Sequence, residues 1–354
     1  MTHPYDGLEA RAFWRSAVAE AGPFGLTGLW TPKFRLERGH GIVTAGSCFA
    51  QHIGRALKAR GHRWMETEPA PPFFGEAERA AFNYGIFSFR TGNIYTARML
   101  LQWLRLAFDE GAVPDETWEQ ESRLTDPLRP VIEPGGFDGA AELRAAREAT
   151  CAAIRRAVRE ADWFVFTLGL TESWRNTDTG LEYALCPGTV AGRFDPARHA
   201  FHNAPMAEIL ADLSAALELM RRENPALRVL LTVSPVPLTA TASGQHVLCA
   251  SGYSKSVLRA VAGQAASEFD FVDYFPSYEI ITSPVFRGIF FAPNMRSVEP
   301  QGVETVMGHF FADQERVFGP LDPPEAGAED PPAAVRRNRD DVTCEEELLG
   351  AFAS

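Results

Sequence analysis

Positive charge is scarce in this sequence. Its 34 lysine and arginine residues are outnumbered by 46 aspartate and glutamate residues, which gives a net charge of -12 at pH 7 and an isoelectric point near 5.2. No run of lysine and arginine interrupts this acidic background. Because binding to a phosphate backbone depends on clustered cations, the composition argues against a nucleic-acid partner.

Cysteines are few, odd in number and widely separated. The chain has Cys48, Cys151, Cys186, Cys249 and Cys344, and no two of them form a C-x-x-C pair. This pattern is typical of neither a disulfide framework nor a zinc site. We therefore expect free thiols, no metal and no cofactor.

Apolar stretches that could cross a membrane are also missing, since no window approaches the roughly 18 uninterrupted apolar residues of a spanning helix. Near the amino terminus, Asp6, Glu9 and Arg11 precede any apolar run. A secretory leader has the opposite order, with basic residues before a hydrophobic stretch. These observations predict a cytoplasmic protein with no membrane span.

What the sequence does contain is an alternation of buried strands and amphipathic helices. Its 354 residues, 45% of them hydrophobic, are enough to bury a large core. A segment that is apolar on both faces, such as 163–168, is typical of a parallel strand covered by helices on each side. We predict an α/β fold, a three-layer α/β/α sandwich with a mostly parallel, flavodoxin-like sheet. The expected strands are 42–44, 163–168, 229–233 and 269–275, and the expected helices are 49–57, 95–109, 139–161, 201–220, 257–266 and one led by Val303.

Three further segments complete the predicted organisation of one domain over residues 1–319. An extension, 1–40, contains an amphipathic helix at 10–21 that we expect to pack on the sheet. An insertion at about 110–140 is rich in proline and glycine and is expected to flank the site. The tail, 320–354, is rich in proline and charge, which predicts disorder, with 348–352 as a short apolar end able to dock.

Residues 41–61 carry the strongest sign of chemistry. They read as a short strand, a small-residue turn and a helix, with Ser47 at the turn. Its hydroxyl would then lie at the carboxyl end of a parallel strand, beside the positive end of a helix, which suits a nucleophile or an anion-binding group. The alternative is that Ser47 simply caps the helix.

The string Gly46-Ser47-Cys48-Phe49-Ala50 is the signature from which the GSCFA family takes its name, and the chain resembles that family. The family is similar to the SGNH, or GDSL-like, hydrolases, in which the serine of a Gly-Asp-Ser turn accepts the acyl group. The resemblance therefore implies Ser47 as the nucleophile. Cys48 is the second choice.

Two later stretches fall where SGNH enzymes place their oxyanion groups. In 82–93, glycine and asparagine punctuate a β-like run, which would let backbone amides turn outward, although a hairpin with no ligand is the alternative. The resemblance implies Gly85 as an oxyanion donor, together with Asn83 and Asn93.

The second stretch follows the strand 163–168. SGNH enzymes have Gly-x-Asn-Asp here, so Gly169 matches, Thr171 falls on the asparagine position and Glu172 on the aspartate position. This is a departure from the family pattern, because threonine offers a hydroxyl in place of the amide donor.

The general base is the largest departure from the SGNH pattern. The Asp-x-x-His block would fall on Asn294 and Ser297, so the usual histidine is absent. We expect His246, in a loop after the strand 229–233, to serve instead, with Glu172 as the alternative if burial raises its pKa. His52, five residues after Ser47, is expected to point down a different side of its helix.

These inferences together predict an enzyme, a serine-dependent esterase or O-acyltransferase that hydrolyses or transfers a small acyl group on a sugar or glycan. Ser47 would attack, and the amides of Ser47 and Gly85 would hold the oxyanion. The competing hypothesis is a non-catalytic protein that binds a glycan or other ligand on a degenerate hydrolase fold. A third uses Cys48 as a thiolate nucleophile. The acyl group, the acceptor and the oligomeric state stay open.

Overall fold

The computed structural model describes residues 3–110, 115–320 and 344–352. At its centre lies a four-stranded sheet in the order β1-β4-β8-β9, in which all neighbours pair in parallel. The strands are β1 (Ile42–Gly46), β4 (Trp163–Leu168), β8 (Arg228–Val233) and β9 (Val272–Tyr274). The four predicted strands are therefore confirmed.

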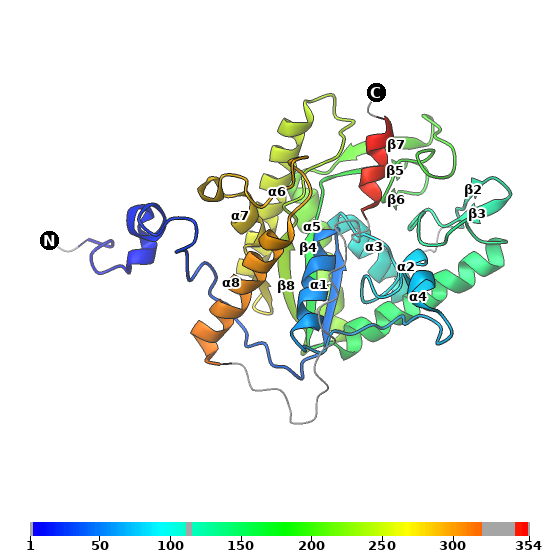
Figure 1. Cartoon of the computed structure of the whole chain (residues 1–354). Coiled ribbons are helices and arrows are strands. Elements are labelled where there is room, and N and C mark those ends of the chain that lie inside the picture. Colours follow the sequence, from blue (N-terminus) through cyan, green and yellow to red (C-terminus); the bar gives the residue numbers. More distant parts are fainter. Residues whose placement is uncertain (1–2, 111–114, 321–343, 353–354) are drawn as a thin grey trace.

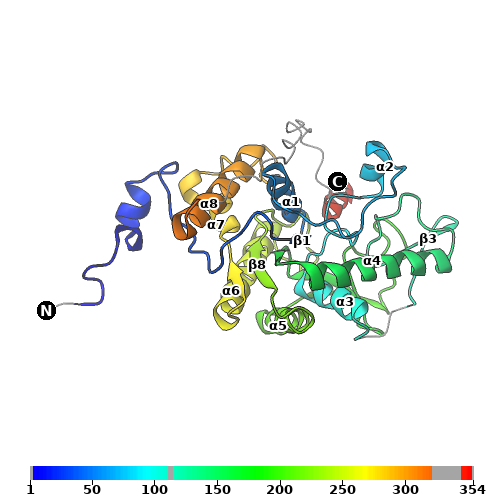
Figure 2. The ribbon, with the colours of Figure 1, turned by 90° about the horizontal axis from the view of Figure 1, so that it is seen from below.

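Helices cover both faces of this sheet, as Figure 2 shows. One face carries α3 (Ala97–Ala107), α4 (Ala140–Glu160), α5 (Met206–Glu223) and α6 (Val247–Glu268), and the other carries α1 (Phe49–Ala59), α7 (Ser277–Thr282) and α8 (Pro300–Phe318). Successive residues of β4 alternate between the two cores: Phe164 and Phe166 join the first, Trp163 and Val165 the second. The predicted three-layer α/β/α sandwich is confirmed.

Smaller elements form two sheets that are separate from the central one. Strands β5 (Glu172–Asn176), β6 (Glu182–Tyr183) and β7 (His199–Asn203) form an antiparallel sheet in the order β6-β5-β7. The insertion contains the hairpin of β2 (Trp118–Gln120) and β3 (Arg123–Thr125). It is fastened by a fully buried carboxylate, Asp126, which pairs with Arg129 at 3.1 Å and with Arg147 at 2.7 Å. The remaining helix, α2 (Glu76–Ala81), precedes the stretch 82–93.

The prediction of an amphipathic helix at 10–21 is wrong. This segment holds two short turns, η1 (Ala10–Ala12) and η2 (Arg15–Ala19), neither of which buries a residue. It projects from the body of the protein (Figure 1), and Trp14 is 68% exposed. Only Val18 and Ala21 reach the core, which is too little apolar surface to hold a helix against the sheet.

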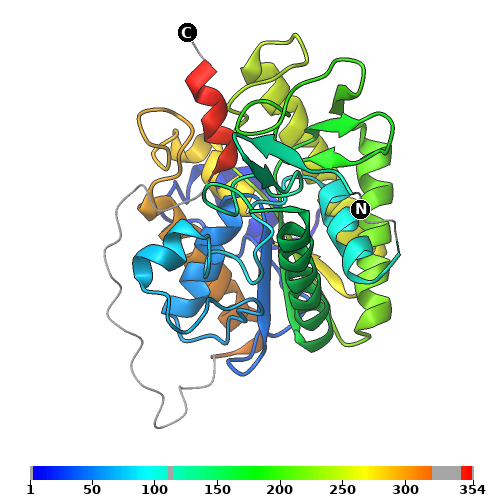
Figure 3. The same cartoon turned by 90° about the vertical axis from the view of Figure 1, so that its right-hand side faces the viewer.

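Three other expectations need correction. Residues 82–93 form turns rather than a β-like run. Helix α6 begins at Val247 rather than Val257, so His246 is its N-cap and not a loop residue. In the tail, residues 321–343 lie outside the described residues, and η4 (Glu345–Phe352) is a docked 3-10 helix, which buries Glu345 and Glu346 rather than the apolar end 348–352 that was expected to dock. Figures 1 and 3 place it at the end of the sheet where β1 gives way to α1.

Another short turn, η3 (Pro284–Phe286), connects α7 to the loop before α8. Within the described ranges, no helix is both long and apolar enough to cross a membrane.

Candidate functional site

The end of β1 is built around a glycine that no other residue could replace without strain. Gly46 has a φ of 128°, and a β-carbon there would lie 2.4 Å from the carbonyl oxygen of Thr167 on the neighbouring strand. Only glycine adopts this conformation at such a close approach. The chain can therefore turn sharply out of the sheet, and the Ser47 amide donates to the Thr167 carbonyl at 3.0 Å.

Ser47 itself is buried, and its Oγ has no hydrogen-bond partner among the described residues. The N-cap of α1 is Cys48, and no side chain caps that helix, so the interpretation of Ser47 as a capping residue is wrong. Gly169 makes room for the serine, since a β-carbon at Gly169 would lie 2.9 Å from the Ser47 Cβ. A buried hydroxyl left without a partner in a native fold calls for a functional explanation.

Residues 92–95 lie directly beside this turn. The Ile94 amide donates to the Gly46 carbonyl at 2.8 Å, and the Tyr95 carbonyl accepts the Gly169 amide at 2.9 Å. Asn93 presents two donors at the same place. Its backbone N–H donates to Glu345 Oε1 at 3.2 Å and its side-chain Nδ2 donates to Glu345 Oε2. Asn93 is thus a predicted oxyanion residue that lies next to the Ser47 turn.

The other predicted oxyanion donors are placed differently. Gly85 is exposed beside the Glu66 carboxylate, and Asn83 Nδ2 donates to the Val131 carbonyl at 3.1 Å. Neither of these contacts involves the Ser47 turn. The Ser47 amide is already engaged by Thr167. These contacts do not support the expectation that the Ser47 and Gly85 amides hold an oxyanion.

The three residues that fall on the Gly-x-Asn-Asp block, at 169, 171 and 172, have different roles in the structure. Gly169 packs on Ser47, as described. Thr171 serves the fold, because its Oγ1 donates to Asn203 Oδ1 at 2.7 Å and its amide donates to Ser254 Oγ at 3.1 Å. Glu172 accepts a hydrogen bond from Thr241 at 2.8 Å and lines a cavity of about 250 Å³. Burial raises the pKa of Glu172, as expected from its position at the strand end.

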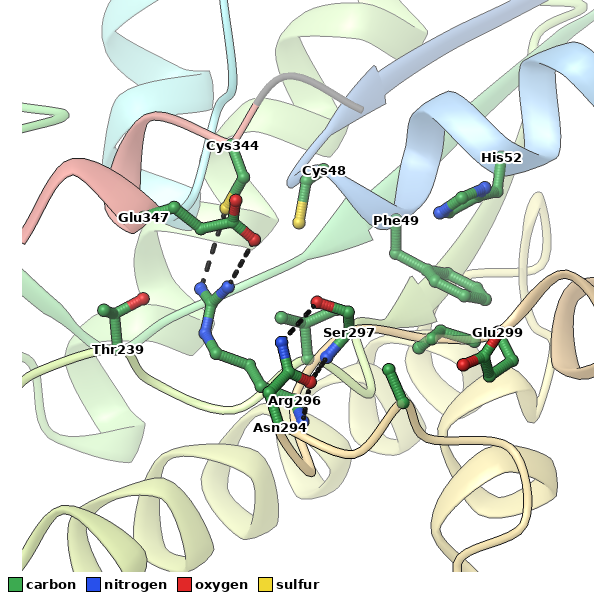
Figure 4. A pocket seen from close by; sticks show the side chains of 13 residues that line it. Cys48, Phe49, His52, Thr239, Asn294, Arg296, Ser297, Glu299, Cys344 and Glu347 are labelled. Atoms are coloured by element: carbon green, nitrogen blue, oxygen red, sulfur yellow. Dashed lines mark hydrogen bonds and ion pairs between the residues drawn. The ribbon is translucent and has the colours of Figure 1, made fainter. Parts of the chain in front are cut away.

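A larger cavity of about 560 Å³ opens beside the Ser47 turn (Figure 4). Its lining includes Cys48, His52, Asn294, Arg296 and Ser297. His52 therefore faces this cavity, contrary to the expectation that it points elsewhere. Burial, with a contribution from the nearby Arg55, lowers the pKa of His52 to about 4.

The residues that replace the Asp-x-x-His block also reach this cavity, where Asn294 Nδ2 donates to Ser297 Oγ at 2.9 Å. His246 does not line either of these two cavities. Its Nδ1 accepts the Leu248 amide at 3.2 Å, as the cap of α6. A ring nitrogen used as a cap on an exposed helix end leaves no geometric reason to choose His246 as the base of Ser47.

Lys255 is a candidate that the sequence reasoning missed. It is buried, and its Nζ donates to the Gly169 carbonyl at 2.7 Å, so it contacts the residue against which Ser47 packs. Burial lowers the pKa of Lys255 to about 8. The sequence does indicate that Lys255 is buried, because it shares a helical face with Leu258 and Ala262, which are both in the core.

Cys48 shares its cavity with Cys344. A hydrogen bond between the two thiols, together with burial, raises the pKa of Cys48, while the same hydrogen bond and the neighbouring Arg296 lower the pKa of Cys344. Arg296 Nη2 lies 3.6 Å from Cys344 Sγ. Cys48 is therefore the protonated partner, which argues against its use as a thiolate nucleophile.

Comparison with known families decides the identity of this arrangement. The model of the GSCFA family matches residues 41–310, which is most of the chain. The chain belongs to the GSCFA family. The match runs from the start of β1 into α8, so this GSCFA domain contains the Ser47 turn, Asn93, Lys255 and Arg296, while residues 344–352 lie beyond it. No curated protein matches the chain. Within the described residues, no group of histidine, cysteine, aspartate and glutamate side chains could hold a metal ion.

Proposed function

We propose that this GSCFA protein is a serine-dependent acyl-ester hydrolase or O-acyltransferase that acts on a small acyl group of a sugar or glycan. The observation that carries the proposal is the pairing of the Ser47 hydroxyl, buried and without a hydrogen-bond partner, with the two donors of Asn93 at the same edge of the sheet. A nucleophile beside a pair of amide donors is what acyl transfer requires.

In the proposed reaction, Ser47 Oγ attacks the ester carbonyl as its proton passes to a base. In this structure Glu345 accepts from both the Asn93 backbone N–H and Nδ2, so once that carboxylate is displaced these two donors hold the negative charge that develops on the carbonyl oxygen. The alcohol leaves with a proton from the base, and water or a sugar hydroxyl then releases the acyl group from Ser47. Loss of one oxyanion donor typically lowers kcat by about 10² to 10³.

We assign the base to Lys255 in place of His246 or Glu172. A neutral lysine can accept the serine proton, and burial brings the pKa of Lys255 close enough to neutrality for this role. Its Nζ contacts Gly169, the residue that also contacts Ser47. His52 is the alternative, because it faces the cavity and is neutral at pH 7.

The second candidate function is ligand binding without catalysis. It is favoured by Asn294 and Ser297, which stand where SGNH hydrolases have aspartate and histidine, and by the lack of a described side chain that accepts the Ser47 proton. A site with these replacements would bind an ester or glycan and leave it unchanged.

A fluorophosphonate probe separates the two candidates. The wild-type chain should become labelled at Ser47, as read by mass spectrometry of the tryptic peptide, and should hydrolyse p-nitrophenyl acetate. Because the probe forms a covalent bond with the serine, labelled protein accumulates over hours even when the reaction is slow. Ser47→Ala should remove both signals, whereas Cys48→Ala, the matched neighbour, should keep them. An unlabelled wild-type chain would favour the binding protein, and loss only in Cys48→Ala would move the assignment to the thiol.

A further inference from the structure

The acidic segment after residue 343 enters the candidate site from outside the matched domain. Glu345 and Glu346 are 5% and 6% exposed, although glutamate is almost never buried unless it is paired. They belong to η4, which lies beyond the family match that ends at residue 310. These two carboxylates therefore need an explanation that the fold of the domain does not supply.

We propose that residues 344–347 are an intramolecular ligand that holds the site closed, and that the cleft they fill is built to receive an acidic molecule with two carboxylates. The cognate molecule would displace the segment. If the site is the acyl-ester site proposed above, then its substrate is an acidic one, and this last step rests on the proposed function.

The carboxylate of Glu345 lies against the two Asn93 donors that are assigned to the oxyanion. Glu345 accepts from the Asn93 N–H and Nδ2, and also from the Tyr95 hydroxyl at 2.9 Å. A β-carbon at Gly92 would lie 2.8 Å from Glu345 Oε1, so the backbone is shaped to let this carboxylate approach. Three hydrogen bonds to one buried carboxylate make a specific anion position.

The carboxylate of Glu346 lies in a separate position, where it pairs with the guanidinium of Arg296. Glu346 Oε1 accepts the Thr239 amide at 2.7 Å, and Glu346 Oε2 pairs with Arg296 at 3.1 Å. The same guanidinium reaches Glu347 at 2.8 Å and Cys344 Sγ at 3.6 Å (Figure 4). Arg296 thus holds the segment at three of its four residues, and all these contacts are polar.

The side of η4 that faces the protein shows that this segment binds like a ligand and does not complete the hydrophobic core. The buried residues of this helix are Glu345 and Glu346, whereas Leu348 and Phe352 are 44% and 64% exposed. A helix that completes a core buries its apolar residues and exposes its charges. Because buried ion pairs and hydrogen bonds contribute little net stability, a competing dianion could replace these contacts.

The same segment divides the two cavities. Cys344 and Glu347 line the cavity of about 560 Å³ that contains His52, while Glu346 and Leu349 line the cavity of about 250 Å³ that contains Glu172. Release of the segment would therefore join both cavities into one groove along the carboxyl edge of the sheet.

The test uses the full chain with Glu345 and Glu346 both changed to glutamine, and Glu304→Gln, an exposed residue of α8, as the matched control. Amide hydrogen exchange of residues 344–352 should speed up about tenfold or more in the double variant, which the loss of one hydrogen bond to a charged group allows. The control should exchange like the wild type. Unchanged exchange in the double variant would overturn the proposal.

The acidic ligand is tested with a fluorescein-labelled peptide of residues 344–352. It should bind the double variant and not the wild type, as measured by anisotropy, and acetyl-Glu-Glu-amide should compete with it whereas acetyl-Gln-Gln-amide should not. Peptide that fails to bind, or that is displaced equally by both competitors, would overturn the acidic cleft.

Two further measurements keep these outcomes interpretable. If thermal melting shows the double variant to be unfolded, the single variants Glu345→Gln and Glu346→Gln replace it in both assays, because they weaken the segment and leave Asn93 and Arg296 of the cleft unchanged. The rate of fluorophosphonate labelling should rise in the opened variant. If exchange and peptide binding behave as expected but no form becomes labelled, the proposed acyl-ester function fails and the intramolecular ligand stands.

Discussion

The most informative perturbation is Lys255→Met, which keeps the length of the side chain and removes its basic nitrogen. With the pKa of Lys255 at about 8, roughly one-tenth of the molecules carry a neutral amine at pH 7, against about 0.03% for an ordinary lysine of pKa near 10.5. Burial thus increases the reactive fraction by about 300-fold. General-base assistance contributes about 10² to 10⁴ in rate, so Lys255→Met should lower turnover by that factor at pH 9.

The assay is the pH dependence of p-nitrophenyl acetate hydrolysis or of labelling at Ser47. Because the base must be deprotonated, the wild-type rate should rise about tenfold between pH 7 and about pH 9, with its midpoint near pH 8. His246→Ala and Glu172→Gln, which change the bases first predicted from the sequence, should leave this profile in place. The nearby Glu346 raises the pKa of Lys255, so Glu346→Gln should move the midpoint to lower pH.

A profile that rises near pH 4 and is lost in His52→Gln would refute the assignment, because burial lowers the pKa of His52 to about that value. So would a Lys255→Met chain with full activity at pH 9. If Lys255 only positions Gly169 through its hydrogen bond to the Gly169 carbonyl, Lys255→Met should lower the rate while the midpoint of the pH profile stays unchanged.

Three other predictions concern stability. Ser47→Ala should leave the melting temperature equal or slightly higher while it abolishes turnover, since it removes a buried hydroxyl that has no partner. Asp126→Asn should lower the free energy of unfolding in urea by about 3 to 5 kcal/mol, because it leaves buried guanidinium groups without their carboxylate. The pKa values of His52 and His62 are lowered by burial to about 4, so the unfolded chain binds protons first and stability should fall as the pH drops from about 6.5 to 4. Replacing both histidines with glutamine should flatten that decline.

The layers of the fold could be predicted from the sequence because local patterns encode them. Strand β4 is apolar on both faces, and helices such as α3 and α4 carry clear stripes, so their existence and order were correct. The Ser47 turn was also found, since a strand, small residues and a helix follow one another within 20 residues of chain. Helix α6 shows the limit of this approach. Its first ten residues include glycine and several polar residues, which hid its start and placed His246 in a loop.

The pocket could not be predicted in the same way, because its contacts join distant parts of the chain. Asn93 was named as a candidate, yet its partner Glu345 lies 252 residues later in a stretch whose charge suggested disorder. Nothing in the local sequence of Glu345 indicates that Asn93 and Tyr95 will bury it. Lys255 was visible as a lysine on an apolar helical face, but only the fold brings it to Gly169.

The docking of Glu345 onto Asn93 also fixes how the site responds to concentration. Both groups belong to one chain, so dilution of the protein does not separate them, and the contact acts at an effective concentration that does not depend on the amount of protein. A free ligand must therefore exceed a threshold set by this intramolecular contact as well as by its own affinity. Below that threshold the site stays closed, and above it the response follows the abundance of the acidic ligand rather than the amount of protein.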